Sequence, residues 1–398
     1  MKWEKVKLGN VTDSCLGKML DQNKNKGDYQ PYLANVNVRW GEFDLEDLPL
    51  MKFEESEQER YELKYGDLVI CEGGEPGRCA IWKEQIPNMK IQKALHRVRV
   101  HDCLDYRYLF YWFLLAGKTG ELDQYFTGAT IKHMPGQKLK EVVIDKPPLE
   151  IQHRIADILS AYDDLIENNQ KQIKLLEEAA QRLYKEWFVD LRFPGHENTK
   201  IVDGVPEGWN TCPFSSKVDI MSGGTPKTSI PDYYNGRIPF YTPKDSDGAF
   251  FAYKTQINIT EGGLKNCNSR LYPPKTVIIT ARGTVGKTTI LAVPMAMNQS
   301  CYALKMKEND APYYLFFALN NEIKALQTMA NGGVFNTIIG KTFDSINIQI
   351  PKDPLIYGFE ETVRPFMEQI KNKLQANSKI VETRNRLLPK LMSGEVEV

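Results

Sequence analysis

The chain contains one internal repeat, and this repeat limits the possible folds more than any other feature of the sequence. Residues of the first half recur in the second half at an offset that stays between 204 and 209 positions, about half of the 398 residues. The matched pairs are Trp3 with Trp209, Leu8 with Phe214, Gly77 with Gly286, Ile81 with Ile290, Gln92 with Gln299, Gly128 with Gly333 and Pro147 with Pro351. An offset kept along the whole chain indicates the duplication of a complete unit.

A glycine-rich turn lies at the same place in both copies. The segment CEGGEPGRCAI begins at Cys71 and TARGTVGKTTI begins at Thr280. Each follows a short apolar run, Leu68–Ile70 or Val277–Ile279, that predicts a strand. The segments DYRYLFYWF and APYYLFFAL then match further along the two copies. We expect the same sequence of elements in both halves.

Each copy ends in a long helical pattern. Apolar residues recur every 3.5 positions over 151–189 and again over 359–391, which is the spacing of a coiled coil. A helix over 151–189 would be roughly 58 Å long, more than the diameter of a domain of about 150 residues. We therefore expect the two helices to pair with each other. Asn169 and Asn377 lie at equivalent points of the two patterns and could fix their register.

These patterns predict an α+β fold with two similar domains, each followed by a long helix. The two helices are expected to form an antiparallel coiled coil with pseudo-twofold symmetry. The predicted segments are a first domain at 1–146, a central helix at 147–193, a linker at 194–206, a second domain at 207–353 and a C-terminal helix at 354–398.

Composition excludes several classes of protein. No apolar run approaches the ~20 residues of a membrane helix, and the N-terminus lacks the apolar core of a signal peptide, so a cytoplasmic protein is expected. The seven cysteines are scattered without a CxxC pair, and neither His96 nor His101 has a partner at ligand spacing, so we expect no metal. The net charge is zero, but 207–353 carries 15 basic and 11 acidic residues, whereas 147–193 carries 6 and 9. This difference suggests DNA contact in one part and protein contact in another.

The segment ARGTVGKT at Ala281–Thr288 fits a loose phosphate-loop pattern, but its context argues against nucleotide binding. A phosphate loop opens a helix, whereas the residues that follow, TILAVP, are typical of a strand. The other copy has Arg78 and Cys79 where Lys287 and Thr288 stand, so the hydroxyl that would bind Mg²⁺ is missing there. A P-loop nucleotide hydrolase is the alternative function that the sequence leaves open, and a coiled-coil scaffold without DNA recognition is another.

The chain resembles the specificity subunits of type I restriction–modification systems. The resemblance lies in the tract from Pro147 to Gly195, in VPEGW at Val205–Trp209, in Ser222–Asp245 and in the C-terminal LLPKLMSGEVEV. Pro365, in the second helix, departs from the pattern and predicts a bend or displacement of its first turns.

The resemblance implies a DNA-specificity subunit that is not itself an enzyme and holds no cofactor. The domains at 1–146 and 207–353 would be target-recognition domains, and each would read one half of a bipartite double-stranded DNA target through the major groove. The helices would space the halves and bind two modification subunits and, through them, the restriction subunits.

Individual DNA contacts are predicted from residue type. Asn reads adenine and Arg reads guanine through paired hydrogen bonds, and basic side chains on turns can approach a phosphate. The candidates are Asn35, Asn37, Arg39, Arg78, Lys227, Lys244, Arg282 and Lys287.

Overall fold

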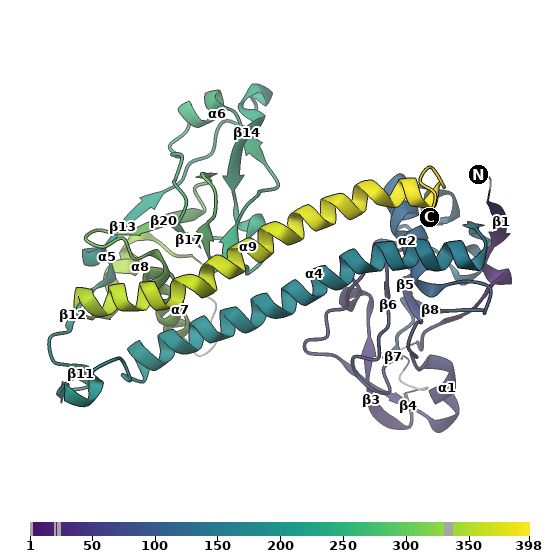
Figure 1. The fold of residues 1–398 in the computed structure, drawn as a ribbon, viewed down its shortest axis with the longest axis horizontal. Coiled ribbons are helices and arrows are strands. Elements are labelled where there is room, and N and C mark those ends of the chain that lie inside the picture. Colours follow the sequence, from purple (N-terminus) through teal and green to yellow (C-terminus); the bar gives the residue numbers. More distant parts are fainter. Residues whose placement is uncertain (1–2, 20, 22–24, 330–336) are drawn as a thin grey trace. The chain divides into compact units, whose positions relative to one another are not determined.

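The structure is a computed structural model that describes residues 3–19, 21, 25–329 and 337–398, with the side chains of 324–329 left aside. The chain forms two compact units (Figure 1). Unit 1 comprises 1–166 and 379–398, and unit 2 comprises 167–378. The long helices α4 (Leu149–Tyr184) and α9 (Asp353–Met392) each contribute one end to each unit.

Unit 1 is built on a four-stranded sheet in the order β2-β8-β5-β6, with a three-stranded sheet β4-β3-β7 and a two-stranded sheet β1-β9. Its strands are β1 (Glu4–Lys7), β2 (Thr12–Leu16), β3 (Asp28–Leu33), β4 (Leu50–Phe53), β5 (Leu68–Cys71), β6 (Cys79–Ile81), β7 (Lys90–Ile91), β8 (Leu95–Val100) and β9 (Val143–Lys146). Its shorter helices are α1 (Gln58–Tyr61), α2 (Tyr106–Thr119) and α3 (Gly136–Glu141).

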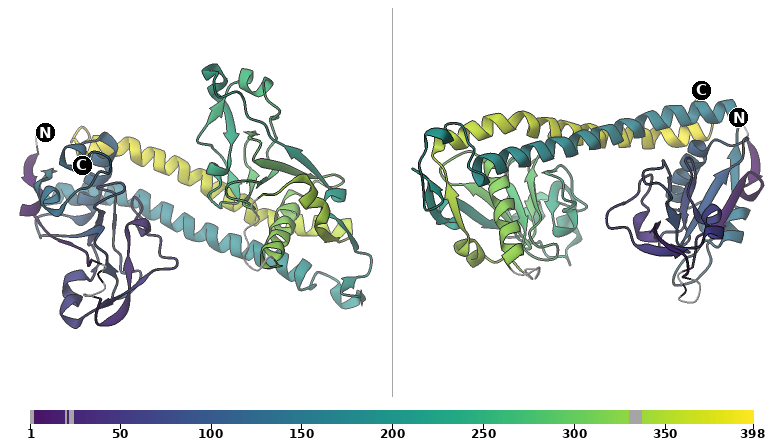
Figure 2. Two further views of the ribbon diagram at one scale, coloured as in Figure 1. Left: turned by 180° about the vertical axis from the view of Figure 1, so that it is seen from behind. Right: turned by 90° about the horizontal axis from the view of Figure 1, so that it is seen from below.

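The main core of unit 1 joins the sheet to α2 and to the ends of both long helices. Leu68 and Val98 from the sheet, Phe113 from α2, Leu159 from α4 and Leu388 from α9 are all buried in one cluster. Both chain ends also belong to this unit (Figure 2), where the indole Nε1 of Trp3 donates to the carbonyl of Met392 at 3.2 Å.

Unit 2 repeats this plan with a five-stranded sheet β13-β20-β17-β18-β15, a three-stranded sheet β16-β14-β19 and two pairs, β12-β21 and β10-β11. Its strands are β10 (Ile201–Val202), β11 (Val205–Pro206), β12 (Asn210–Pro213), β13 (Val218–Ser222), β14 (Tyr234–Tyr241), β15 (Phe251–Ala252), β16 (Asn258–Ile259), β17 (Val277–Thr280), β18 (Thr288–Leu291), β19 (Ala296–Met297), β20 (Cys301–Met306) and β21 (Asn347–Ile350). Its shorter helices are α5 (Phe214–Lys217), α6 (Glu261–Lys265), α7 (Pro312–Met329) and α8 (Gly340–Ser345).

The main core of unit 2 joins sheet, α7 and long helices in the same way. Tyr184 from α4 stacks on Phe317 of α7, with ring centroids 5.9 Å apart, and meets Phe359 of α9 edge to face at 5.8 Å. One polar pair links the long helices within this unit: Asn169 Nδ2 donates to Asn377 Oδ1 at 2.8 Å. The two asparagines that lie at equivalent points of the two sequence patterns therefore contact each other.

The mixed helix–strand fold with two similar units agrees with the prediction. The long helix predicted over 151–189 is α4 followed by a π-helical turn at Lys185–Val189. The second helix runs from Asp353 to Met392 and includes Pro365. The bend or displacement of its first turns stays a prediction. Gly333, the predicted match of Gly128, lies outside the described residues. The exact segment boundaries stay a prediction.

None of the helices in the described part of the chain has both the length and the apolar character that crossing a membrane requires.

Candidate nucleic-acid interface

The glycine-rich turn has the same backbone in both units. In unit 1 it connects the antiparallel strands β5 and β6, and in unit 2 it connects β17 and β18. The amide of Gly77 donates to Cys71 O at 3.0 Å, and the matched amide of Gly286 donates to Thr280 O at 2.9 Å. Both glycines have positive φ, +89° and +83°, a conformation that side-chain-bearing residues rarely adopt. The motif is therefore a turn between strands in each unit, as predicted, and does not open a helix.

A short 3₁₀ turn lies beside each glycine-rich turn, and we call it the tip. The tip of unit 1 is Asn35–Asn37, directly after β3, and the tip of unit 2 is Pro243–Asp245, directly after β14. Both are closed by the same bond. Asn37 Oδ1 accepts from the amide of Ala34 at 2.9 Å, and Asp245 Oδ2 accepts from the amide of Thr242 at 2.8 Å.

Side-chain bonds hold each tip against its turn. In unit 1, Asn35 Nδ2 donates to Gly73 O at 2.9 Å, and in unit 2, Thr284 Oγ1 donates to Pro243 O at 3.3 Å. The sequence comparison missed this pairing of tip and turn. Its only local signal is an acceptor side chain, Asn37 or Asp245, three residues after the position that it caps.

The four candidates of unit 1 are all at or beside the tip and turn, and most of their polar atoms are engaged. Asn37 is 6% exposed, and its Nδ2 donates to Asp44 O at 3.0 Å. Asn35 bonds to the turn, and Arg78 bonds to both Glu75 and Asn35. Arg39 is exposed and donates to the carbonyl of Val36 within its own loop.

The four candidates of unit 2 are exposed cations. Lys244 is the middle residue of the tip, and Arg282 and Lys287 lie on the glycine-rich turn. Lys227 lies outside both, in the segment between β13 and β14. Within the described residues, none of the four has a carboxylate at salt-bridge distance, so each keeps its full charge available for an anion.

The thiol beside the unit 1 turn stays protonated. Cys71, at the end of β5, is buried, and this burial raises the pKa of its thiol to about 11 although the Arg78 guanidinium opposes the shift. A thiol with this pKa is a poor nucleophile near neutral pH, so the residue belongs to the core of the unit.

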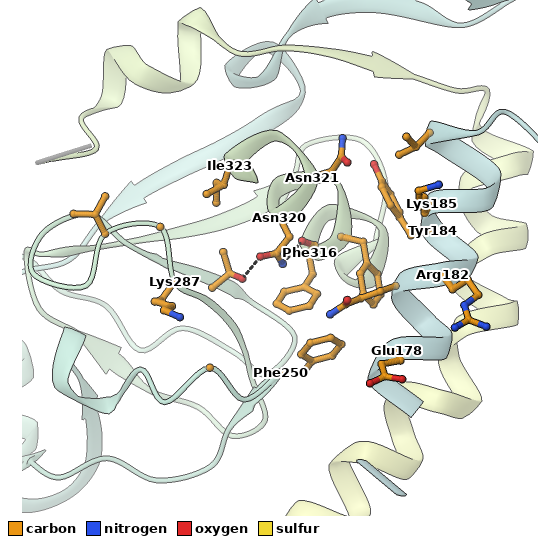
Figure 3. A pocket seen from close by; sticks show the side chains of 17 residues that line it. Glu178, Arg182, Tyr184, Lys185, Phe250, Lys287, Phe316, Asn320, Asn321 and Ile323 are labelled. Carbon is orange, nitrogen blue, oxygen red and sulfur yellow. Dashed lines mark hydrogen bonds between the residues drawn. The ribbon is translucent and has the colours of Figure 1, made fainter. Parts of the chain in front are cut away.

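A cleft of about 790 Å³ lies beside the turn of unit 2 (Figure 3). Lys287 stands on one wall, Arg182 and Lys185 on the opposite wall, and Phe250 and Phe316 between them. The α4 wall also carries Glu178. Because its rim holds charges of both signs, the cleft does not by itself select an anionic ligand.

Comparison with known proteins gives one consistent result. The family model described as "Type I restriction modification DNA specificity domain" matches twice, at residues 1–178 and 206–377. The chain is 29% identical over 341 residues to the type I restriction enzyme MjaIX specificity subunit of Methanocaldococcus jannaschii, covering 84% of this chain and 78% of that protein. It is 22% identical to the HindI specificity subunit of Haemophilus influenzae, covering 99% of each chain.

The fold also has a solved counterpart. The crystal structure of a type I restriction–modification system S subunit from M. genitalium aligns with a TM-score of 0.58 at 17% identity, covering 98% of this chain and 96% of that one. The double family match coincides with the two copies of the turn and the tip. This chain belongs to the family of type I restriction modification DNA specificity domains.

Proposed function

We propose that this chain is the DNA-specificity subunit of a type I restriction–modification complex and that each unit reads one half of a bipartite target. The observation that carries the proposal is the same turn and tip built twice, once in each copy of the family domain. Two copies of one reading device suit a target in two parts. The strand β18 after the turn argues against the alternative of a P-loop hydrolase.

The two units differ in the residues through which they contact DNA. Lys227, Lys244, Arg282 and Lys287 contact phosphates or bases of the second half-site, because they are exposed and have no carboxylate partner among the described residues. In unit 1, the tip and the glycine-rich turn, which carry Asn35, Asn37, Arg39 and Arg78, meet the first half-site as one body, since side chains of each bond to the backbone of the other.

The proposed partners are double-stranded DNA, two modification subunits and, through these, restriction subunits, all in the cytoplasm. The chain supplies recognition only and neither methylates nor cleaves DNA. The predicted domains at 1–146 and 207–353 are the readers. The helices at 147–193 and 354–398 pair as an antiparallel coiled coil with pseudo-twofold symmetry, bind the modification subunits and space the readers. The bond between Asn169 and Asn377 supports this pairing.

The test is to map methylated adenines in DNA from cells that express the chain with its modification subunit. We expect one motif of two defined half-sites around an undefined spacer. The matched control replaces Met1–Lys146 with the corresponding part of a relative, and only one half-site should change. A motif that changes in both halves would contradict separate readers. ATP turnover by the purified chain that Lys287→Ala abolishes would favour the hydrolase.

The spacing role has its own test. Seven residues inserted directly after Asn169 and directly before Asn377 lie at the same level of the proposed antiparallel pair, so Asn169 stays opposite Asn377 and the apolar seam stays aligned. The inserts lengthen the helices by roughly 10 Å, which corresponds to about three base pairs of spacer. We expect a longer spacer with unchanged half-sites. An active variant with the original spacer would contradict the proposal that the helices set the distance.

A further inference from the structure

The guanidinium of Arg78 is occupied on both sides. One terminal nitrogen donates to Glu75 Oε2 at 3.1 Å, and the other donates to the backbone carbonyl of Asn35 at 3.1 Å and approaches Asn35 Oδ1 at 3.4 Å. The side chain is 17% exposed, and its Nε is buried with no hydrogen-bond partner among the described residues. Arg78 therefore lies between the glycine-rich turn and the tip.

The turn and the tip lie close together, and a further hydrogen bond connects the turn to the loop that follows the tip. Gly74 has a φ of +73°, and a Cβ at this position would lie 2.8 Å from Asn35 Nδ2. The second oxygen of Glu75 accepts from the indole Nε1 of Trp40 at 2.7 Å. The loop from Asn35 to Trp40 is thus attached to the turn at both of its ends, and Glu75 connects the Trp40 end to Arg78.

This attachment determines which side chains of the loop face solvent. Asn37 and Val38 point into the unit and are 6% and 0% exposed, whereas Val36 is 69% exposed. Arg39 keeps about half of its side chain in solvent. An apolar group of this kind can contact the methyl group of thymine, and a guanidinium can pair with guanine.

We propose that Arg78 is a positioning residue, which holds the tip of unit 1 against its turn and so presents Val36 and Arg39, and that it does not itself contact DNA. The inference rests on the proposed function, because it assumes that this tip meets the first half-site. It adds an apolar reading residue, Val36, which the residue types in the sequence did not single out.

In unit 2, the residue that matches Arg78 does not hold the tip. The tip of this unit is attached by the neutral hydroxyl of Thr284, so Lys287, the match of Arg78, has no partner in the tip. Lys244 replaces Val36 at the middle of the tip. We therefore expect the two units to bind DNA differently. Exposed cations of unit 2 contact phosphates, whereas unit 1 recognises its half-site through the shape of a fixed loop.

The experiment measures DNA binding by the chain assembled with its modification subunits. The probes are a duplex with the methylated motif, a duplex with the first half-site altered, and both at several salt concentrations. Lys287→Ala should weaken binding to both duplexes alike and reduce the slope of log affinity against log salt by about 0.9, the value for one phosphate. Arg78→Ala should leave that slope unchanged and reduce discrimination of the first half-site about tenfold, the scale of one mismatched base pair.

Arg78→Lys separates charge from position. A lysine keeps the charge, but its single ammonium nitrogen lacks the planar fork by which two separate guanidinium nitrogens reach Glu75 and Asn35. This variant should therefore lose discrimination as Arg78→Ala does. If Arg78→Lys keeps full discrimination, if Arg78→Ala lowers the salt slope, or if Arg78→Ala changes neither quantity, the positioning role is wrong. If Arg78→Ala does not fold, Arg78→Lys decides, with a thermal melt as its folding control. If the wild-type complex shows no preference for its motif, the proposed function fails instead.

Discussion

Helices α2 and α7 hold the same place in the two units, but different residues satisfy their first backbone amides. In unit 1, the carboxylate of Asp105 caps α2 and accepts from the amides of Arg107 at 2.7 Å and Tyr108 at 3.3 Å. In unit 2, the matched residue is Ala311, whose methyl side chain offers no acceptor. There, Glu360 of α9 accepts from the amide of Tyr314 at 2.7 Å.

The residue of α4 that matches Glu360 is Gln152, and it also accepts a hydrogen bond from a backbone amide at the start of the shorter helix. Its Oε1 accepts from the amide of Asp105 at 2.9 Å, and its Nε2 donates to Pro147 O at 2.8 Å. A neutral amide suffices in unit 1, because Asp105 supplies the local cap. The comparison shows that a lost helix cap can be replaced from a long helix distant in sequence, at the cost of a buried carboxyl group. Burial raises the pKa of Glu360 to about 7.

The largest effect is expected from removing this substitute cap. Glu360→Ala leaves the amide of Tyr314 buried without its acceptor and opens a cavity, so the free energy of unfolding of unit 2 should fall by about 2–4 kcal/mol at pH 5. Glu360→Gln keeps an acceptor, as Gln152 does, and should stay within about 1 kcal/mol of wild type. Calorimetric unfolding of the full chain would measure both. Equal losses in the two variants would show that the hydrogen-bond acceptor at position 360 does not determine the stability of unit 2.

The pH dependence gives the next effect. Because the folded pKa of Glu360 is raised from 4.5 to about 7, its contribution is fully present below pH 4.5 and is lost as pH rises through 7. Wild type should therefore lose stability relative to Glu360→Gln over this interval, by at most about 3 kcal/mol. Melting both proteins at pH 4.5, 6 and 8 tests the sign. A Gln variant that becomes relatively less stable at pH 8 would mean that the folded pKa is lowered.

The sequence could predict the parts of this comparison that depend on local pattern. The glycine-rich turns follow from glycines at matched positions, and α4 and α9 follow from their apolar spacing. The role of Glu360 could not be predicted, because along the helix it is one polar residue among many. Only the packing of α9 against the start of α7 places it at Tyr314. Likewise, Asn37 has the residue type of a base contact, but its amide closes the tip.

A smaller loss is expected at the local cap of unit 1. Asp105→Ala removes the acceptor for two amides and one partner of Arg107, and should cost about 1–2 kcal/mol. The effect is limited because Arg107 keeps its pair with Asp157 and Gln152 keeps its bonds to the carbonyls of Pro147 and Cys103. Asp105→Asn should restore most of the loss, since asparagine is also a good cap. Thermal unfolding of the three proteins would measure this, and a loss as large as that of Glu360→Ala would remove the distinction between the two units.

The smallest difference concerns the tyrosines that link α2 and α7 to the long helices. Tyr111 donates to Asp163 Oδ2 at 2.6 Å, and Asp163 also pairs with Arg384. Tyr313 donates to Glu368 Oε1 at the longer distance of 3.2 Å, and the side chain of Glu368 is 41% exposed.

Tyr111→Phe should therefore cost about 1 kcal/mol and Tyr313→Phe about 0.5 kcal/mol or less, because water can replace the lost bond more readily at the exposed carboxylate. Denaturant unfolding of both variants, with the unchanged slope as a control for the folded state, would measure the difference. A larger loss from Tyr313→Phe would mean that α7 depends on its side-chain bond to α9 more than α2 depends on α4, which would extend the contrast seen at Glu360 to Glu368, about two turns further along α9.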